Sequence, residues 1–505
     1  MRAGMPAASC VAIFVAFLAF QAFAEDAPAP APKPVKITAD TQWSGEVSVE
    51  SDVQVDSGTL TVAPGTKVTL KPAGKIIVGA NGALVAKGTA EKPVEITGDG
   101  CGLIKTVRGK MELERCRITG VRNTSGNRSL MLDALVGKPG VAIRDCRIES
   151  CGGMYASFDG GAFEVSGCDI RKGDPGENNG ISTYGAGSLL FERNTVEGTS
   201  VGAGSGADAV IRENVIIDGT LSAWKPAKLL AERNYVHRPK PGGTYATRTL
   251  TGVTRDNVFR GGSWVSAQMG GELVGNVLIS LPHENIGGPG DYDKSCTHEH
   301  ICGLAPNSRV ERNIFVGASY GAVMGIGDGT CSDSVIRNNT FDSRDRGNAI
   351  YLNHLPKSNP KGIVVKNNIF MRCGPVYSES DVPDSTSLVD FNLWSGGKSK
   401  ERFKNLKMAG KSPGDPGMGG RDVPPADKDP LPPASVVANP DIAFPFTDEE
   451  MLARKHKVEE VLKAYRDAYT PVKGSAAIDA GDPADKDDPA VKDGRPDIGA
   501  IERTN

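Results

Sequence analysis

The chain has 505 residues, a formal net charge of −3 at pH 7 and 62 glycines. Its length exceeds that of one ordinary compact domain, and its nearly balanced charge argues against a nucleic-acid partner. No apolar run after residue 24 is long enough to span a bilayer, so we expect no membrane insertion. We also expect the protein to be a monomer.

Residues 1–24 predict an export signal. Arg2 supplies the charged start, Val11–Phe20 form a short apolar core, and Ala22–Ala24 form a small-residue cleavage site. We therefore expect a secreted, periplasmic or cell-surface protein that is cleaved near Ala24. Residues 25–34, in which Ala and Pro alternate, predict an extended linker.

A short pattern recurs along the middle of the chain: an apolar residue, two variable residues, an Asn or Cys, one variable residue, and a second apolar residue. We call the Asn or Cys the pivot. The spacing between pivots ranges from 19 residues (Asn257 to Asn276) to 37 residues (Asn276 to Asn313). A repeat of this kind indicates a solenoid, and short alternating apolar runs indicate coils made of strands. The pivots are Cys116, Cys146, Cys168, Asn194, Asn214, Asn234, Asn257, Asn276, Asn313, Asn339, Asn368 and Asn392.

We expect the chain to bend at each pivot, because Asn tolerates the left-handed backbone region better than most residues. Stacked at about 4.8 Å, successive Asn amides would hydrogen-bond as a ladder inside the solenoid. The three Cys pivots would replace the first rungs with small buried apolar ones. The apolar residues on either side of each pivot should fill the interior.

This repeat resembles the right-handed parallel β-helix of the pectate-lyase-like superfamily. Residues 60–66, 82–89 and 93–97 are similar to the first coils of many such secreted proteins, and 477–482 with 496–502 to a frequent C-terminal signature. The resemblance implies an all-β fold: a single-stranded right-handed parallel β-helix, or solenoid, with a C-terminal α-helix and tail. Since this fold hosts many activities, the function has to be read from the site.

After the signal and linker, the sequence predicts four further parts. These are an N-terminal cap with the first coils (35–98), the parallel β-helix (99–395), an extended loop region rich in Pro and Gly (396–446), and a closing part (447–505). Residues 447–450 form a capping box, which predicts one α-helix over about 448–468. The Asp residues of the tail allow Ca²⁺ binding, but we favour their role as turn residues.

A β-helix interior is packed, so a substrate must lie on an outer face, beside loops that project from it. The largest insertion separates Asn276 from Asn313, and four of the six His residues fall on it or on strands in the same row. Alternation along the strands upstream of the pivots assigns one set of side chains to the outer face. These residues are Tyr184, Thr247, Ser266, Gln268, His298, His300, Tyr351 and Asn353.

His298 and His300 allow three interpretations. In the first, one of them acts as a general base or acid on a sugar, and Arg248 or Lys294 offsets the charge of a uronate. Such chemistry needs a base that removes the proton next to a carboxylate and a cation that stabilises the developing charge.

In the second interpretation, His298 and His300 are ligands of a transition metal such as Zn²⁺, with His283 as a possible third ligand. In the third, the stretch is structural: Cys296 and Cys302 close a disulfide loop, and the His residues bond to their neighbours. The cofactor prediction therefore stays open between none and a divalent metal, Ca²⁺ or Zn²⁺.

Aromatic and polar residues near these strands are candidates for binding substrate, since rings can stack on sugars. The sequence lacks the Asp-rich strand clusters of pectate lyases and the paired Asp motif of polygalacturonases. We expect an exported polysaccharide lyase or glycoside hydrolase that holds a polysaccharide in an external groove. The alternative is a non-catalytic carbohydrate-binding or cell-surface structural solenoid. The candidate binding residues are Gln268, Tyr351, Asn353, Tyr184, Trp264 and His354, with Tyr155, Trp224 and Tyr245 as weaker ones.

Overall fold

The computed structural model describes residues 33–503 apart from several segments. The segments left out are 126–127, 172–179, 240–244, 249–251, 262–263, 270, 281–299, 318–320, 326–330, 346, 353–360, 378–385, 398–400, 405, 407, 409, 413, 416, 426, 490 and 492–494. Strand residues 124–125, 128, 245–248, 264–269, 300–302 and 321–325 are described by their backbone alone. The predicted export signal and most of the linker lie outside these ranges.

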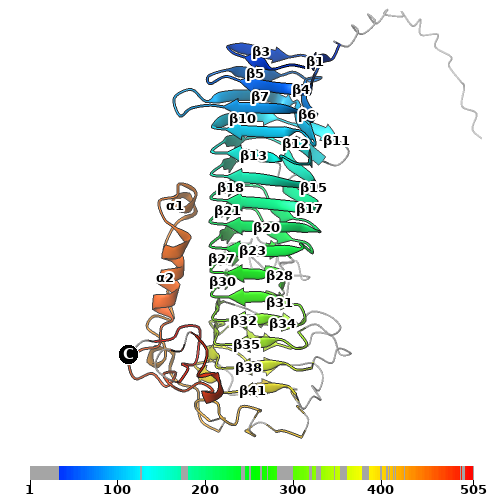
Figure 1. Cartoon of the computed structure of the whole chain (residues 1–505). Coiled ribbons are helices and arrows are strands. Elements are labelled where there is room, and N and C mark those ends of the chain that lie inside the picture. The colour runs from blue at the N-terminus through cyan, green and yellow to red at the C-terminus, as the bar shows by residue number, and fades with distance from the viewer. Residues whose placement is uncertain are drawn as a thin grey trace, which may run out of the picture.

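The described chain winds as a right-handed parallel β-helix, as predicted (Figure 1). A typical coil contains β19 (Val201–Ala203), β20 (Ala207–Arg212) and, after the pivot, β21 (Val215–Ile217). Each of these strands pairs in parallel with the equivalent strand of the neighbouring coil, so three sheets run along the axis. We name them sheets 1, 2 and 3 after the order of their strands within a coil.

Among the described residues, sheets 1 and 2 form one 28-stranded network, because four long strands bend from one sheet into the other. These strands are β4 (Asp52–Val62), β6 (Lys75–Lys87), β15 (Gly153–Ser166) and β17 (Ile181–Glu192). Sheet 1 also contains β1 (Val35–Ile37), β8 (Leu103–Val107), β11 (Asn123–Ser125), β12 (Arg128–Val136), β19, β22 (Leu221–Ala223), β25 (Tyr245–Arg248), β28 (Trp264–Met269), β31 (His300–Leu304), β34 (Gly321–Gly325), β37 (Asn348–Tyr351), β40 (Val376–Tyr377) and β43 (Phe403–Lys404). Sheet 2 also contains β2 (Thr41–Trp43), β9 (Lys110–Glu114), β13 (Val141–Arg144), β20, β23 (Lys228–Glu232), β26 (Val253–Arg255), β29 (Glu272–Val274), β32 (Arg309–Glu311), β35 (Val335–Arg337), β38 (Val364–Lys366) and β41 (Leu388–Asp390).

Sheet 3 is separate and has fifteen strands within the described part of the chain. They are β3 (Glu46–Val49), β5 (Lys67–Leu70), β7 (Val94–Cys101), β10 (Cys116–Val121), β14 (Arg147–Glu149), β16 (Asp169–Arg171), β18 (Thr195–Glu197), β21, β24 (Tyr235–His237), β27 (Val258–Gly261), β30 (Val277–Ser280), β33 (Ile314–Val316), β36 (Thr340–Asp342), β39 (Ile369–Met371) and β42 (Leu393–Ser395).

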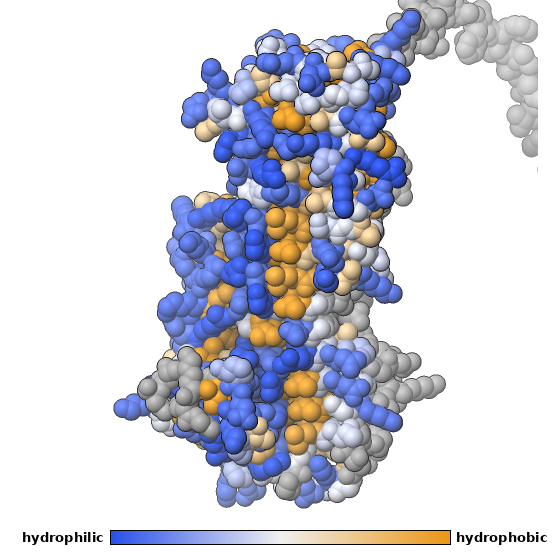
Figure 2. Space-filling view, viewed as in Figure 1, coloured by the Kyte–Doolittle hydropathy of each residue, from blue (hydrophilic) through white to orange (hydrophobic). Residues whose placement is uncertain are grey.

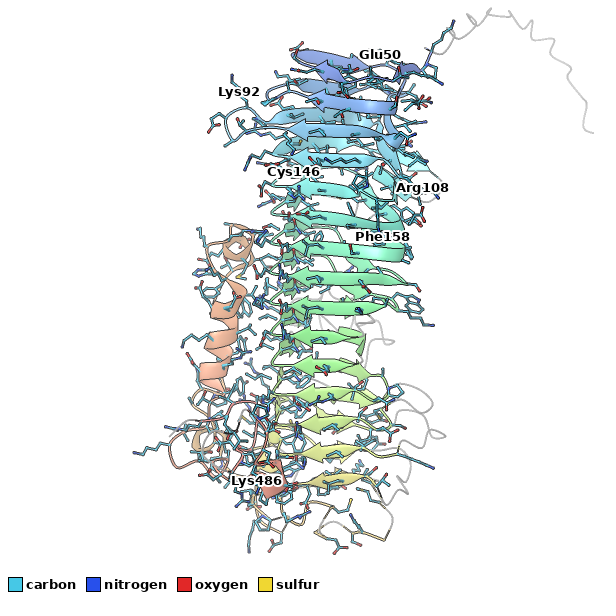
Figure 3. All side chains as sticks on the ribbon, viewed as in Figure 1. Glu50, Lys92, Arg108, Cys146, Phe158 and Lys486 are labelled. Carbon is cyan, nitrogen blue, oxygen red and sulfur yellow. The ribbon has the colours of Figure 1, made fainter. Side chains whose placement is uncertain are left out.

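The predicted ladder of pivots is confirmed. The Nδ2 of Asn276 donates to Oδ1 of Asn313 at 3.0 Å, and Asn257 donates to Oδ1 of Asn276 in the same way at 2.9 Å. The chain of amides runs without a break from Asn194 to Asn392, and every member is fully buried. The thiols of the Cys pivots continue this column in the N-terminal half, where Cys146 is labelled in Figure 3.

The prediction that the pivot itself takes the left-handed conformation is wrong. The residue before each pivot takes it: Arg193, Glu213 and Arg233 have φ of 53°, 57° and 52°. The pivot's own amide is directed into the interior, where it hydrogen-bonds along the ladder. Two adjacent residues therefore have separate roles. The residue before the pivot, which is often charged, makes the bend, and the pivot forms the ladder.

The C-terminal part runs back along the solenoid and covers sheet 3 (Figure 1). The predicted single helix is interrupted: α1 (Asp448–Leu452) and α2 (Val458–Ala468) are separated by residues 453–457. The predicted capping box at Thr447 and Glu450 is confirmed. Within the break, Arg454 has φ of 54°, and its Nε donates to Thr195 Oγ1 on β18 at 2.8 Å. The break thus lets Arg454 turn toward the solenoid.

The covered strands of sheet 3 are buried on both sides. Their outward residues pack against the helices and tail in one apolar cluster. Part of the predicted extended loop region also joins the fold, since Met418, Val423 and Leu431 form bridges to the last strands. The 3₁₀ helices η2 (Pro433–Ser435) and η3 (Pro483–Asp485) complete the closing part. The cluster contains Val215, Ile217, Tyr235, Val258, Val277, Ile279, Ile314, Val316, Ile369, Met371 and Leu393 from the sheet, and Met451, Val458, Val461, Leu462, Tyr465 and Ala468 from the helices.

Candidate functional site

The outer face of sheet 1 carries a row of polar residues aligned across successive coils. Ser182, Gly202 and Ser222 are in register on β17, β19 and β22, and Arg248 continues the row on β25. The inward residues beside them, which include Thr183, are buried, so the alternation predicted for these strands holds here. Three consecutive coils thus present small or hydroxylated residues to solvent.

Two aromatic side chains stand beside this row. Tyr184 is 41% exposed and Trp224 is 57% exposed, and both line one hollow of about 130 Å³. The predicted outward position of Tyr184 is confirmed. Its ring lies 5.6 Å from that of Tyr155 on the preceding coil. The other residues that line the hollow are Ile181, Ser182, Thr183, Ser200, Gly202, Ala203, Gly204, Thr220 and Ser222.

Gly204, directly after β19, lies on the coil between those of Tyr184 and Trp224 and lines the hollow. Gly204 follows Ala203, which pairs with the residues before Tyr184 and Trp224. A Cβ on Gly204 would lie 1.9 Å from the Thr183 carbonyl oxygen, so packing demands glycine there. Because neighbouring strands lie about 4.8 Å apart, the two aromatic residues are separated by roughly 10 Å along the axis.

Two ion pairs described on this face lie upstream of the hollow. Lys105 Nζ lies 3.1 Å from Asp133 Oδ2, and Arg108 pairs with Asp159 at the edge of the sheet (Figure 3). The nearest described cation is Lys225, whose Nζ lies 5.9 Å from the ring centre of Trp224. These contacts leave the hollow itself with aromatic and hydroxyl groups as its chemistry.

Most of the predicted site residues lie outside the described part of the chain or are described by backbone alone. His283, Lys294, His298, Asn353 and His354 belong to the first group. The second group is Arg248 on β25, Trp264 and Gln268 on β28, and His300 on β31. The predicted disulfide between Cys296 and Cys302 is likewise untested.

Tyr351 was predicted to face outward and bind substrate, but its side chain is only 1% exposed. Its ring lies 4.6 Å from that of Tyr377, which pairs with it on β40. The neighbouring residues Ile350 and Leu352 are buried as predicted. Burial between adjacent coils makes the predicted stacking of the Tyr351 ring on a sugar inconsistent with this structure.

On β25, at Ser266 of β28 and on β31, the register differs from the prediction by one residue. Thr247 pairs with Leu221 and Ser266, and Ser266 pairs with Cys302. This row contains Leu221 and Ile350, whose side chains are buried. The same register aligns His300 with Gly321 and Asn348, so its predicted outward position does not follow from alternation. An irregularity between Ser266 and Met269 on β28 could not be anticipated from an alternating pattern.

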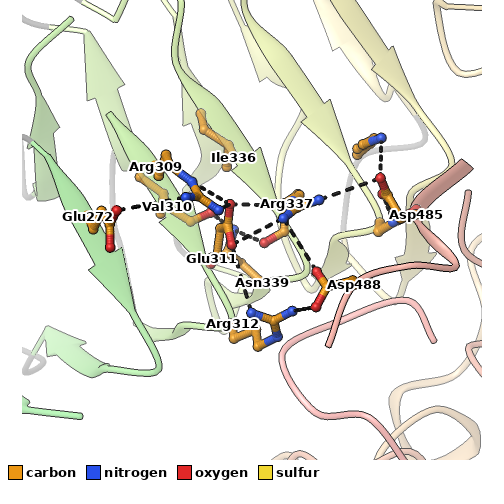
Figure 4. Close-up of polar contacts among 12 residues, drawn as sticks. Glu272, Arg309, Val310, Glu311, Arg312, Ile336, Arg337, Asn339, Asp485 and Asp488 are labelled. Atoms are coloured by element: carbon orange, nitrogen blue, oxygen red, sulfur yellow. Dashed lines mark hydrogen bonds and ion pairs between the residues drawn. The ribbon is translucent and has the colours of Figure 1, made fainter. Parts of the chain in front are cut away.

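The tail carboxylates that we considered for Ca²⁺ contact cations of sheet 2 instead (Figure 4). Asp485 lies 2.9 Å from Lys366 Nζ, and Asp488 pairs with Arg312 and Arg337. Asp482 acts as a turn residue and accepts a hydrogen bond from the Ala484 amide. The residues that the structure describes contain no group of three or more His, Cys, Asp or Glu placed to hold a metal ion.

The outer face of sheet 2 has a different character, which sequence reasoning missed. Leu190, Val210, Leu230 and Val253 are in register and form an aliphatic stripe (Figure 2). An ion-pair ladder borders it, in which Arg212 and Arg255 donate to Glu192 and Glu232. A stripe of this kind has few polar groups that could orient a sugar.

No helix among the described residues is long and apolar enough to cross a membrane.

The structure therefore defines a parallel β-helix with one open face that carries exposed aromatic rings. No family model matches the chain, and no curated protein is similar to it. Among solved structures, the chain is similar to the periplasmic alginate epimerase AlgG, with 11% identity, a TM-score of 0.31, and 71% and 85% of the two chains covered. It is also similar to the pectate lyase Pel9A, with 13% identity, a TM-score of 0.30, and 94% and 97% covered. Similarities this low carry no functional argument, so function must be argued from the open face.

Proposed function

We propose that this protein is an exported polysaccharide-binding protein whose ligand lies along the outer face of sheet 1. The observation that carries the proposal is the hollow of about 130 Å³ between the exposed rings of Tyr184 and Trp224. Aromatic rings stack on the apolar faces of sugars, and hydroxyl groups such as those of Ser182 and Ser222 pair with sugar hydroxyls. Ligand pockets are typically lined by aromatic side chains with a few polar groups, as this hollow is.

We further propose that a lyase or hydrolase reaction takes place downstream of the hollow, on the coils of β25, β28 and β31. The described carboxylates upstream, Asp133 and Asp159, are held in ion pairs and are poor candidates for a general base. The chemistry would then rest on Arg248, Lys294, His298 or His300. Three rungs separate β22 from β31, which is roughly 14 Å along the axis, so one oligosaccharide spans both sites.

The first experiment asks whether the mature protein cleaves a polysaccharide. Neutral and acidic polysaccharides are incubated with it, and new reducing ends and the absorbance of unsaturated uronates are measured. Replacing both His298 and His300 with Ala should abolish turnover while binding persists. Turnover that is unchanged in this double variant would disprove the assignment of these two residues.

The alternative is binding without chemistry, and one observation favours it. The register aligns His300 with Asn348, two residues before the buried Ile350 on the same strand, so alternation places His300 with the inward positions. In that case some of the polysaccharides tested bind in a way that requires Tyr184 and Trp224, but none of them yields a cleavage product. Loss of binding in Tyr184→Ala and Trp224→Ala is expected under both versions, so retention of full affinity in both variants would contradict the proposal.

A further inference from the structure

We infer that the hollow between Tyr184 and Trp224 is a subsite for one neutral sugar ring and excludes acidic sugars. This inference rests on the proposed function, since it names the kind of residue that the polysaccharide places there. Its basis is the shape of the hollow, a lining glycine that neither close packing against the backbone nor a positive φ requires, and the chemistry of the lining.

Gly202 is this lining glycine. It lies in register between Ser182 and Ser222, and its backbone does not adopt a positive φ. A Cβ at this position would meet Ser222 Oγ at 3.1 Å and nothing else closer than 3.6 Å. Glycine within a strand is destabilising and often marks a close approach by another molecule. The missing side chain of Gly202 is part of the open space of the hollow.

The hollow has the dimensions and groups that suit a flat, hydroxylated ring. Tyr184 and Trp224 flank it from coils two rungs apart, roughly 10 Å along the axis. Hydroxyl groups surround the space between them, and Thr220 Oγ1 lies 2.9 Å from Ser200 Oγ. A pyranose ring presents C–H groups on its faces and hydroxyls at its edge, which matches this arrangement.

The lining also argues against an acidic ring. None of the described residues that line the hollow is charged. A carboxylate placed there would lose hydration without gaining a cation in the hollow, which costs free energy. Lys225 is close by, but its Nζ lies over the ring of Trp224, 5.9 Å from the ring centre. The next charged position in the row is Arg248, one rung beyond Ser222, so an acidic sugar is expected at that rung instead.

The test uses the full mature protein and oligosaccharides of defined length. Cello-, xylo- and manno-oligosaccharides are the neutral probes, and oligogalacturonate and oligoguluronate are the acidic ones. Affinities are measured by titration calorimetry for the wild type, Gly202→Val, Trp224→Ala and Ser188→Val. Ser188 is exposed on the same strand β17 but on the face of sheet 2, so its substitution controls for adding a branched side chain to this region.

We expect at least one neutral probe to bind, and its affinity to fall about tenfold or more in Gly202→Val and in Trp224→Ala. Ser188→Val should bind as the wild type does. Because Trp224 is 57% exposed, its variant keeps the test valid even if Gly202→Val folds poorly.

Three results would overturn the inference, and they differ in what else they overturn. If no probe binds the wild-type protein, the proposed function fails as well. If only acidic probes bind, the protein still binds polysaccharides but the hollow does not select a neutral ring; loss of that binding in Arg248→Gln would identify the rung responsible. If a neutral probe binds equally to all variants, it occupies another part of the face.

Discussion

The outer faces of sheets 1 and 3 are built from the same coils but have opposite surfaces. On sheet 3, outward residues from β21 onward, such as Val215 and Ile314, are apolar and covered by the chain's own C-terminal part. On sheet 1, the outward residues of the first two of these coils are Gly202 and Ser222, accompanied by the exposed ring of Trp224. The fully apolar face therefore forms an intramolecular contact, whereas the face with isolated rings among hydroxyls stays exposed, and that is the face for which we propose a ligand.

The limit of the covered region can be read from single positions. On β10 and β14 the outward residues Arg117 and Arg147 are exposed, and the first apolar outward residue comes at Val215. Arg454, in the break between the two helices, contacts β18 on the coil just before that change. The C-terminal part of the chain therefore covers sheet 3 only as far as its outward residues are apolar. The sequence pattern of the strands thus matches the extent of the tertiary contact.

The largest expected effect contrasts one residue from each face. Leu462 is 2% exposed in the apolar cluster over sheet 3, so Leu462→Ala should lower the free energy of unfolding by about 2–5 kcal/mol. Trp224→Ala on sheet 1 should change it by no more than about 0.5 kcal/mol, because the ring is more than half exposed. Urea unfolding of both variants measures the difference.

Amide hydrogen exchange shows whether the loss of stability in Leu462→Ala is confined to the helices. In Leu462→Ala, faster exchange confined to α1 and α2, with the Asn ladder still protected, would show that the cover detaches as a unit. A stability loss in Trp224→Ala that equals the loss in Leu462→Ala would contradict the division into a structural and a binding face.

The second prediction tests the column that both faces share. Asn276 accepts from Asn257 and donates to Asn313, so Asn276→Cys interrupts the ladder on both sides. Asn194 adjoins the last Cys pivot, so Asn194→Cys only moves the boundary between thiols and amides by one rung. The Asn276 side chain takes part in five hydrogen bonds and that of Asn194 in three, so at about 1 kcal/mol per hydrogen bond we expect losses of about 5 kcal/mol and about 3 kcal/mol, respectively. Equal losses in thermal or urea unfolding would show that the ladder is not cooperative.

The repeat made the fold predictable, because the pivot spacing identified the coils and the burial of the pivots followed from it. The row of Ser182, Gly202 and Ser222 could also have been found, since the pivots Asn194, Asn214 and Asn234 are evenly spaced. The cover on sheet 3 has a signal as well: the residues directly after and three after a pivot, such as Val215 and Ile217, are both apolar. An amphipathic helix elsewhere in the chain needs such a surface to pack against.

The register downstream was harder, because it depended on alternation across strands interrupted by insertions. One irregularity on β28 is enough to exchange inward and outward rows, and the backbone register aligns Thr247 and Ser266 with the buried Leu221 instead of with the outward row. Tyr351 illustrates a second limit: its burial depends on a contact with Tyr377 on another coil, which no local pattern encodes. Long-range packing and insertions therefore bound what the sequence predicts about the site.

The third prediction concerns the C-terminal end of the ladder. Asp422 is 3% exposed and accepts two hydrogen bonds of 2.8 Å, one from the backbone N–H of Asn392 and one from Trp394 Nε1. Burial raises the pKa of Asp422 from 3.8 to about 6. A raised pKa in the folded state means that the stabilising effect of protonation is complete below about pH 4 and is lost as pH rises through about 6. The stability of the wild type relative to Asp422→Asn should therefore increase by up to about 3 kcal/mol between pH 7 and pH 4. The opposite trend in urea unfolding would show that the two donors hold Asp422 as a stable carboxylate.

The smallest expected effect is a pH dependence that should appear in the helices over sheet 3 and be absent from ligand binding on sheet 1. His237 on β24 is buried beneath α1, with Nδ1 2.8 Å from both carboxylate oxygens of Asp448, beside Tyr235 and with Arg260 4.0 Å from Asp448. Burial lowers the pKa of His237, and the charge of Arg260 lowers it further, although Asp448 and Asp218 favour the charged form. A lowered pKa in the folded state means that this contribution to stability is present above about pH 6.5 and is lost as pH falls below it. Acidification to about pH 5.5 should speed proteolysis or amide exchange in α1, and His237→Gln should remove that pH dependence.

The affinity of the hollow for its neutral probe should stay constant over the same range, because its described lining has no group that titrates there. If affinity and helix protection fall together, with the same midpoint, the cover on sheet 3 and the open face of sheet 1 are coupled, and the separation between them is lost.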